Sequence, residues 1–193
     1  MVAPNLTPRQ QAVLLARQMI SQNPVYLDTE TTGLEKIDEI IEITIMDDTG
    51  QVLLNSLVRP SQPIPLNATA IHGISNDQVQ KAPTWPILWQ QVRPLLLGKV
   101  IVAYNSGFDH RMLQQSHARY RLPWRDTFSF FDLLNLYSQW RGEWDSQRRS
   151  WKYFSLAAAG KTANISLPNA HRATADTLLA RALLHYLAGE QVG

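Results

Sequence analysis

The sequence has 193 residues, of which 45% are hydrophobic and 18% are charged. This length suits one ordinary α/β domain and is short for two. No apolar run approaches the roughly 18 residues that a membrane span requires, and the N-terminal residues lack the basic start and apolar stretch of a secretion signal. The absence of cysteine excludes a disulfide framework, a thiolate zinc site and a cysteine nucleophile. We therefore expect a soluble, cytoplasmic protein.

The formal net charge of +2 hides an uneven distribution of charge along the chain. Residues 25–50 hold eight acids and one base, whereas residues 110–172 hold ten bases and four acids. The acidic first segment could bind cations, and the basic second segment could bind a polyanion. Two solvated faces explain the same counts, so charge alone does not decide between these interpretations.

The N-terminal half predicts one helix and three strands. A helix from Thr7-Pro8 to about Ser21 begins with an N-cap threonine and a proline at the first helical position. This helix covers an edge of the domain or docks a partner, and its residues do not decide which. Apolar runs separated by a turn predict three strands in one antiparallel meander, at residues 25–27, 39–46 and 51–58.

The following segment, residues 59–74, holds three prolines and is predicted to be an ordered loop. Beyond it, strands and helices alternate, and residues 140–152 are polar and predicted to be irregular. The predicted strands lie at 100–103 and 128–132, and the predicted helices at 85–97, 108–120, 133–140, 153–159 and 172–187.

This order predicts an α/β fold with a mixed five-stranded sheet, formed by an antiparallel meander plus parallel strands, and helices on both faces. We expect an N-terminal helical extension, residues 1–24, followed by a single main domain, residues 25–189.

Acidic side chains stand at the ends of the predicted strands. Asp28 and Glu30 are two residues apart, so a strand places both carboxylates on one side. Two like charges buried together are costly unless a cation joins them. Asp109 follows the strand at 100–103, and His171 and Asp176 bracket the start of the last helix. One Asp-x-Glu pair is ordinary at a strand end, so the interpretation depends on the whole set.

Four segments follow one another in the chain, and all but the second carry these residues: Asp28-Thr-Glu-Thr-Thr-Gly-Leu34, Thr69-Ala-Ile-His-Gly-Ile74, Ala103-Tyr-Asn-Ser-Gly-Phe-Asp109 and His171-Arg-Ala-Thr-Ala-Asp176. They resemble the motifs of the DEDDh-type 3′→5′ exonucleases, the family of the proofreading epsilon subunit of bacterial DNA polymerase III. The likeness runs from about Val25 to Leu187. It implies a ribonuclease H-like exonuclease domain that binds two divalent ions, Mg²⁺ or Mn²⁺.

The resemblance also implies roles for the five charged residues. Asp28, Glu30 and Asp176 would hold the metal beside the attacking water, with Asp28 bridging to a second metal that Asp109 supports partly through water. His171 would act as general base, a role that suits imidazole because its ordinary pKa is near neutrality. The chemistry agrees, since two metals about 3.5 to 4 Å apart can neutralise a phosphodiester, generate hydroxide and stabilise the leaving alkoxide. The other six acids of residues 25–50 are expected to face solvent.

Implied substrate contacts surround these acids. For several of them a structural role is an equal alternative to substrate contact. Leu34 and Phe108 could be core residues, and His72 could form hydrogen bonds within its own loop. Asn105 either braces Asp109 or only caps the next helix. The implied contacts are Thr31, Thr32, Gly33, Leu34, Ile71, His72, Asn105 and Phe108.

The likeness fades between Asp132 and His171, where residues 140–152 interleave three tryptophans with four bases. Cations for phosphates and rings for stacking are typical of single-strand binding. Trp144, Arg148 and Arg149 are therefore predicted substrate contacts. The alternative is that the tryptophans cover the core beneath a solvated loop.

These patterns favour a metal-dependent 3′→5′ exonuclease that releases nucleoside 5′-monophosphates from single-stranded ends. DNA is favoured over RNA because the motifs resemble the proofreading branch more than the oligoribonuclease branch. An RNA-trimming exonuclease remains an alternative, as does a nucleic-acid-binding or polymerase-partner module without turnover. The expected partners are DNA or RNA 3′ ends; a polymerase partner is left open, and no membrane partner is expected.

Overall fold

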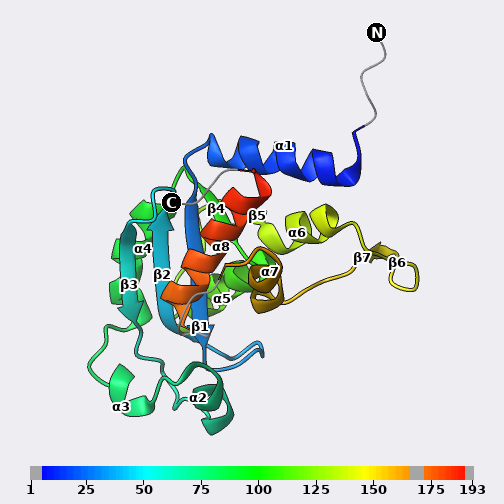
Figure 1. The fold of residues 1–193 in the computed structure, drawn as a ribbon. Helices are drawn as coiled ribbons and strands as arrows, with labels where there is room; N and C mark the ends of the chain where they lie inside the picture. The colour runs from blue at the N-terminus through cyan, green and yellow to red at the C-terminus, as the bar shows by residue number, and fades with distance from the viewer. Residues whose placement is uncertain (1–5, 166–171, 190–193) are drawn as a thin grey trace.

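The computed structural model describes residues 6–165 and 172–189. A five-stranded sheet in the order β3-β2-β1-β4-β5 occupies its centre (Figure 1). The first three strands form the antiparallel meander, and β4 and β5 run parallel to β1, which confirms the predicted mixed sheet. The strands are β1 (Val25–Thr31), β2 (Ile40–Asp47), β3 (Val52–Leu57), β4 (Val100–Ala103) and β5 (Ser129–Asp132).

Helices cover both faces of this sheet. One face packs against α1 (Pro8–Ile20), α6 (Leu133–Arg141), α7 (Leu156–Thr162) and α8 (Ala173–Leu187). The other packs against α4 (Trp85–Leu96) and α5 (Ser106–Arg119). Among the described residues, no helix is both long enough and apolar enough to cross a lipid bilayer.

The N-terminal helix α1 is part of the core. Thr7 forms a capping box with Gln10 at its start, and one side of the helix is lined with small or apolar side chains. Ala12, Ala16 and Met19 are buried in the same cluster as residues of α6 and α8. α1 therefore packs on α6 and α8 and covers part of the core, which agrees with the expectation that it covers an edge of the domain.

The alternation of side chains along β1 positions the candidate site. Tyr26 faces the cluster shared by α1, α6 and α8, while Val25 and Leu27 face α4 and α5. Because side chains alternate along a strand, Asp28 and Glu30 lie on the same face as Tyr26, toward α8.

The segment 59–74 contains a helix, so the prediction of a loop throughout it is wrong. Its three prolines all precede α2 (Leu66–His72), and Pro65 takes the N-cap position. A short helix α3 (Asn76–Val79) follows, with a capping box between Ser75 and Gln78. Proline is well suited to the start of a helix, and here the last proline precedes the first residue of α2.

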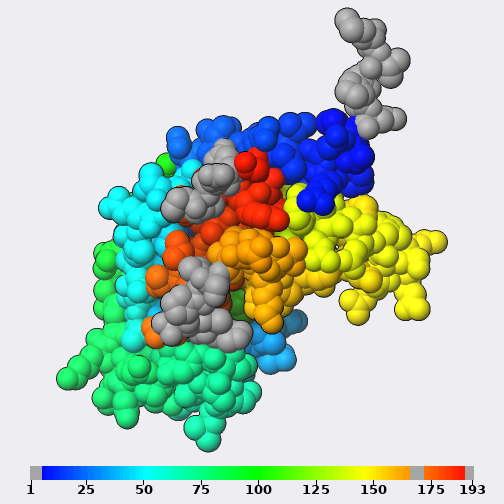
Figure 2. Space-filling model, in the orientation of Figure 1, coloured from blue at the N-terminus to red at the C-terminus, as the bar shows by residue number. Residues whose placement is uncertain are grey.

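Residues 140–152 also differ from the prediction, because they contain a small hairpin of β6 (Trp144–Asp145) and β7 (Ser150–Trp151). Asp145 Oδ1 accepts hydrogen bonds from the backbone amides of Gln147 and Arg148, at 2.9 and 3.0 Å, which shape the turn. Trp144 pairs with Trp151 across the two strands. Figure 2 shows this segment, in yellow, projecting at one side of the molecule.

Helix α7 begins and ends later than predicted and continues through Gly160. Ser155 caps its start by accepting a hydrogen bond from Ala158 N at 3.2 Å. A Cβ built on Gly160 would lie 2.9 Å from a methyl group of Leu179 on α8. Gly160 therefore allows close packing of α7 on α8, and it does not terminate the helix.

Candidate active site

Three carboxylates converge where β1 approaches the start of α8. Asp28 and Glu30 extend from β1, and Asp176 extends from the first turn of α8. Each offers an oxygen atom, and the three oxygens lie within 4.8 Å of one another. This convergence was predicted from the sequence.

Asp109 lies beside this group, in the first turn of α5. Its side chain is 2% exposed, and Thr29 Oγ1 donates a hydrogen bond to Asp109 Oδ1 at 2.8 Å. Thr29 stands between Asp28 and Glu30 with its side chain toward the opposite face of the sheet, so β1 holds Asp109 directly. The charge of Asp109 also raises the pKa of Asp28.

Burial and mutual repulsion perturb the whole cluster. Burial raises the pKa of Asp28 well above its ordinary value, and Asp109, Asp176 and Glu30 raise it further. Burial, followed by the charges of Asp176 and Glu42, raises the pKa of Glu30 to about 8. Each shift reflects the cost of ionising one carboxylate beside others in a poorly hydrated site.

Burial also raises the pKa of Asp109 to about 7, although the hydrogen bond from Thr29 opposes this rise. The nearby charge of Asp132 contributes a further increase. The site therefore holds more negative charge than its protein surroundings stabilise when all these carboxylates are ionised.

The donor set fits a divalent cation. Within residues 6–165 and 172–189, the carboxylates of Asp28 and Glu30 make no hydrogen bond or ion pair. Both side chains are partly buried, and partly buried acids without such partners are costly when ionised. Hard, oxygen-only ligands match Mg²⁺ or Mn²⁺, and bound charge of +2 would offset the repulsion.

A buried ion pair that the sequence analysis missed anchors the start of α8. Glu42 on β2 is 1% exposed and lies opposite Glu30 in the strand register. It accepts hydrogen bonds from Arg172 Nε at 3.1 Å, Arg172 Nη2 at 2.5 Å and Ala173 N at 3.0 Å. Since Asp176 follows within the first turn, this ion pair positions the α8 carboxylate.

The expectation that six acids of residues 25–50 face solvent is wrong for two of them. Glu42 is buried as described, and Glu39 is 3% exposed. Glu39 accepts hydrogen bonds from the amide and hydroxyl of Ser61 and pairs with Arg119 at 3.6 Å. The sequence held a signal for Glu42, because a glutamate inside the otherwise apolar run of β2 requires a partner.

The predicted general base, His171, lies outside the described residues. The described chain resumes at Arg172, which Glu42 holds. The assignment of His171 therefore stays a prediction from the sequence.

Seven predicted substrate contacts line one cavity of about 520 Å³ next to Glu30. Leu34 is 73% exposed and Ile71 is 63% exposed, so neither belongs to the core. Phe108 is half-buried, packs against the cluster beneath α4 and α5, and also lines the cavity. The seven are Thr31, Thr32, Gly33, Leu34, Ile71, His72 and Phe108.

His72 presents a buried hydrogen-bond donor in this cavity. Its Nδ1 accepts a hydrogen bond from Ile74 N at 3.0 Å, so the neutral ring carries its proton on Nε2. Burial lowers the pKa of His72, which favours this neutral form. Nε2 is buried and makes no well-formed hydrogen bond with the described residues, although the nearby Thr31 backbone raises the pKa of the ring, so an acceptor on a ligand would satisfy it.

Gly33 is held against a carboxylate. A Cβ at this position would lie 2.5 Å from Asp38 Oδ2. Asp38 Oδ1 accepts a hydrogen bond from Thr32 Oγ1 at 2.7 Å, and Asp38 Oδ2 accepts one from Glu35 N at 2.7 Å. These bonds fix the turn that borders the cavity.

Asn105 takes the N-cap position of α5, one of its two predicted roles, but caps it without a side-chain hydrogen bond. Its backbone is left-handed, with φ of 67°. Within the described chain, no hydrogen bond joins it to Asp109. Asparagine tolerates this backbone conformation better than most residues, which explains its place in the turn.

The tryptophan and arginine segment divides between core and surface. Trp140 is 8% exposed and belongs to the core, whereas Trp144 is 54% exposed. Trp144 and Arg149 line a second cavity, while Arg148 lies outside its lining and pairs with Asp145 at 3.9 Å. The prediction of a tryptophan covering the core is thus correct for Trp140 and wrong for Trp144.

Comparison with known proteins places this geometry in a family. Residues 25–184 match the family model RNase_T, which is described as an exonuclease. An uncharacterized exonuclease, CP81, of Escherichia phage 186 is 36% identical over 180 residues, which span 90% of this chain and 92% of that protein. The DNA polymerase III subunit epsilon of Rickettsia typhi is 27% identical over 123 residues, 61% of this chain and 52% of that subunit.

A solved structure has the same arrangement of elements. Exonuclease X in complex with 5′ overhanging duplex DNA superposes with a TM-score of 0.64 and 25% sequence identity. The match covers 86% of this chain and 93% of that one. The ribonuclease H-like fold predicted from the sequence is thereby confirmed.

Proposed function

Because this chain belongs to the RNase_T family of exonucleases, we propose that it removes nucleoside 5′-monophosphates from the 3′ ends of single-stranded DNA with two divalent metal ions. The observation that carries this proposal is the group of Asp28, Glu30 and Asp176, whose oxygens lie within 4.8 Å of one another beside a cavity of about 520 Å³. Mutual repulsion of these carboxylates destabilises the folded protein, so the arrangement is explained by the binding of cations and a phosphodiester.

Asp28, Glu30 and Asp176 would hold one ion, and Asp28 and Asp109 would hold the second. When bound, such ions supply charge for the phosphoryl oxygens, a hydroxide at neutral pH and stabilisation of the leaving alkoxide. Thr29 fixes the orientation of the Asp109 carboxylate through its hydrogen bond of 2.8 Å. The Glu42–Arg172 ion pair fixes the first turn of α8 and with it Asp176.

The terminal nucleotide would occupy the cavity beside Glu30. Leu34 and Ile71 offer exposed apolar surface for the base and sugar. His72 Nε2–H would donate to an oxygen of the nucleotide, which satisfies a donor that makes no well-formed hydrogen bond with the described residues. These contacts orient the last phosphodiester over the carboxylates.

His171 would accept the proton of the attacking water. Imidazole suits this role because its ordinary pKa is near neutrality. Its place in the sequence, one residue before the Arg172 that Glu42 anchors, supports the assignment. The carboxylates cannot take this role once they bind cations.

DNA is the favoured substrate. Exonuclease X is described in complex with DNA, and the epsilon subunits to which this chain is similar belong to DNA polymerase III. Trimming of RNA is the alternative activity. The epsilon relatives also support a polymerase as a protein partner.

The decisive assay incubates the purified protein with 5′-labelled single-stranded DNA or RNA in Mg²⁺, Mn²⁺ or EDTA. A ladder that shortens from the 3′ end only with metal, and faster on DNA, is expected. Asp28→Ala should lower kcat by about a thousandfold, since metal-borne charge stabilisation contributes several kcal/mol.

A matched control is Asp77→Asn, which removes an exposed carboxylate from α3. This variant should cleave at the wild-type rate. Normal cleavage by Asp28→Ala would show that the site is wrongly assigned, and no cleavage of either substrate with both metals would refute the proposed activity.

A further inference from the structure

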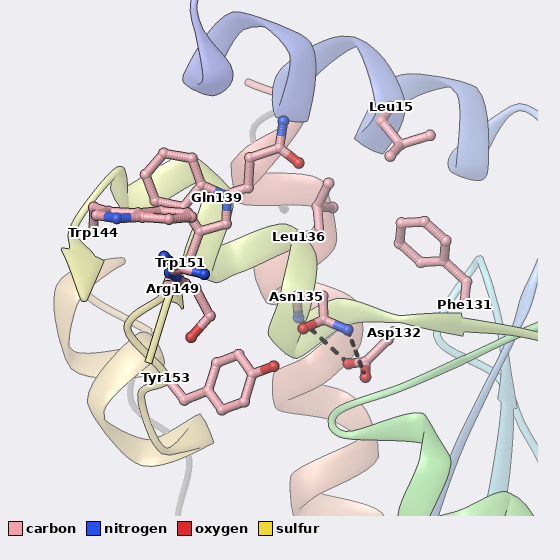
Figure 3. A pocket seen from close by; sticks show the side chains of 11 residues that line it. Leu15, Phe131, Asp132, Asn135, Leu136, Gln139, Trp144, Arg149, Trp151 and Tyr153 are labelled. Carbon is pink, nitrogen blue, oxygen red and sulfur yellow. Dashed lines mark hydrogen bonds between the residues drawn. The ribbon is translucent and has the colours of Figure 1, made fainter. Parts of the chain in front are cut away.

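A second cavity lies between the β6–β7 hairpin, α6 and α1, on the same face of the sheet as Asp28. Its volume is about 500 Å³. Figure 3 shows Trp144, Arg149 and Tyr153 on one side of it and Phe131 and Asp132 on the other. No residue of this cavity lines the cavity beside Glu30.

Two aromatic rings of this cavity are exposed. Trp144 is 54% exposed and Tyr153 is 60% exposed. The indole of Trp144 meets that of Trp151 edge to face, with ring centroids 5.1 Å apart and an interplanar angle of 84°. Trp151 thereby supports the orientation of Trp144, while much of the Trp144 ring surface remains open for stacking.

Arg149 adds a cation beside these rings. Arg148 pairs with Asp145 and Lys152 pairs with Glu143, whereas the guanidinium of Arg149 makes no ion pair or hydrogen bond with the described residues. Its backbone is left-handed, with φ of 53°, a conformation that arginine rarely adopts. Arg149 therefore contributes to this cavity a cation that pairs with none of the described acids.

Asp132 links this cavity to the catalytic edge of the sheet. It pairs with Ala103 at the end of β4, and β4 lies next to β1, so the backbones of Asp132 and Asp28 are about 10 Å apart across two strand spacings. Its charge raises the pKa of Asp109. Its carboxylate accepts hydrogen bonds at the start of α6, including one of 2.9 Å from Leu134 N, which offsets its charge.

We infer that this second cavity binds a base and phosphate of single-stranded DNA upstream of the scissile bond. The inference rests on the proposed function, because the DNA would extend from the carboxylates past Asp132 to the hairpin. Trp144 and Tyr153 stack on a base, and Arg149 pairs with a phosphate. Stacking on an aromatic ring accepts any base, so this site increases affinity without selecting sequence.

The test measures binding without cleavage. The affinity of a fluorescein-labelled DNA of about 12 nucleotides is measured by anisotropy in EDTA at low salt, within the range of lengths that single-strand sites cover. Trp144→Ala should weaken binding about 5- to 150-fold, the range for loss of one stacked base. Trp144→Phe should restore part of the affinity because it keeps a ring.

The matched control compares two arginines. Arg149→Ala should weaken binding and reduce the salt dependence of affinity by about one phosphate contact. Arg93→Ala removes the same charge from a side chain that pairs with Asp126 outside both cavities, and its effect should stay within about twofold. Equal effects of the two substitutions, or unchanged binding by Trp144→Ala, would overturn the inference in favour of non-specific attraction or a different occupant.

Failure of the proposed activity is detected separately. The wild-type protein is assayed with the p-nitrophenyl ester of thymidine 5′-monophosphate in Mg²⁺, a substrate that has no upstream nucleotide. Absence of this cleavage counts against the catalytic proposal. The anisotropy comparison in EDTA still decides whether the hairpin cavity binds DNA.

Discussion

Replacing Glu30 by glutamine is expected to stabilise the metal-free protein at pH 8 and to abolish turnover. The pKa of Glu30 is raised from 4.5 to about 8, first by burial and then by the charges of Asp176 and Glu42. The folded chain therefore binds this proton more tightly than the unfolded chain does. The resulting stability is complete below about pH 4.5 and is lost as the pH rises through about 8.

The size of the effect follows from the same two pKa values. At 1.36 kcal/mol per pH unit, ionisation of Glu30 costs the folded state about 4 kcal/mol at pH 8, where half of the folded molecules carry the proton. Glutamine keeps the shape of the side chain and does not ionise. Glu30→Gln should thus raise the free energy of unfolding by up to about 4 kcal/mol at pH 8 and by almost nothing at pH 4.

The assay is urea unfolding of the wild-type protein and Glu30→Gln in EDTA between pH 4 and pH 9. The difference between the two curves isolates Glu30 from the histidines, which titrate in both proteins. Mg²⁺ should stabilise the wild type strongly at pH 8 and weakly at pH 5, because protons compete with the metal for the same oxygens. If Glu30→Gln is less stable than the wild type at pH 8, ionised Glu30 does not destabilise the metal-free fold and the reasoning is refuted.

Two further substitutions test the supports of the site. Glu42→Gln should destabilise the protein by about 3 kcal/mol and lower kcat, because it removes the charge of the buried partner of Arg172. Urea unfolding measures the loss of stability and steady-state kinetics measure kcat. An unchanged kcat would mean that the ion pair does not position Asp176. Gly33→Ala should cost about 1–3 kcal/mol of stability and raise KM for DNA, because its Cβ would lie 2.5 Å from Asp38 Oδ2. Unchanged stability and KM in Gly33→Ala would show that Asp38 moves away freely.

The sheet could be predicted from the sequence because each strand and turn is marked by a short run of neighbouring residues. The apolar runs of β1, β2 and β4 and the turn at 47–50 are each readable within a few residues. The helix α2 was missed because three preceding prolines dominated the interpretation of residues 59–74. The β6–β7 hairpin was missed because it depends on Asp145 accepting backbone hydrogen bonds in a polar turn and on a cross-strand tryptophan pair.

The candidate site also contains features that short sequence segments predict and features that only the fold reveals. Period-two geometry and the family motifs predicted that Asp28, Glu30 and Asp176 converge, and the structure brings their oxygens within 4.8 Å. The Glu42–Arg172 pair joins residues 130 positions apart and could not be derived from spacing. Arg148 and Arg149 are equivalent in the sequence, and only the fold separates an ion-paired arginine from one that lines a cavity.

The acidic segment that first marked this chain contains two physically different kinds of carboxylate, one fully buried and one partly buried. Glu39 and Glu42 are buried with cations and hydrogen-bond donors of the chain itself, so folding alone accounts for them. Asp28 and Glu30 lack such partners within the described residues, and burial raises the pKa of both. One β-sheet therefore satisfies some of its acids internally and leaves others to be satisfied by cations from solution. A site whose ionised form is unstable without cations binds them with free energy that also stabilises the fold, and this couples metal binding, pH and stability.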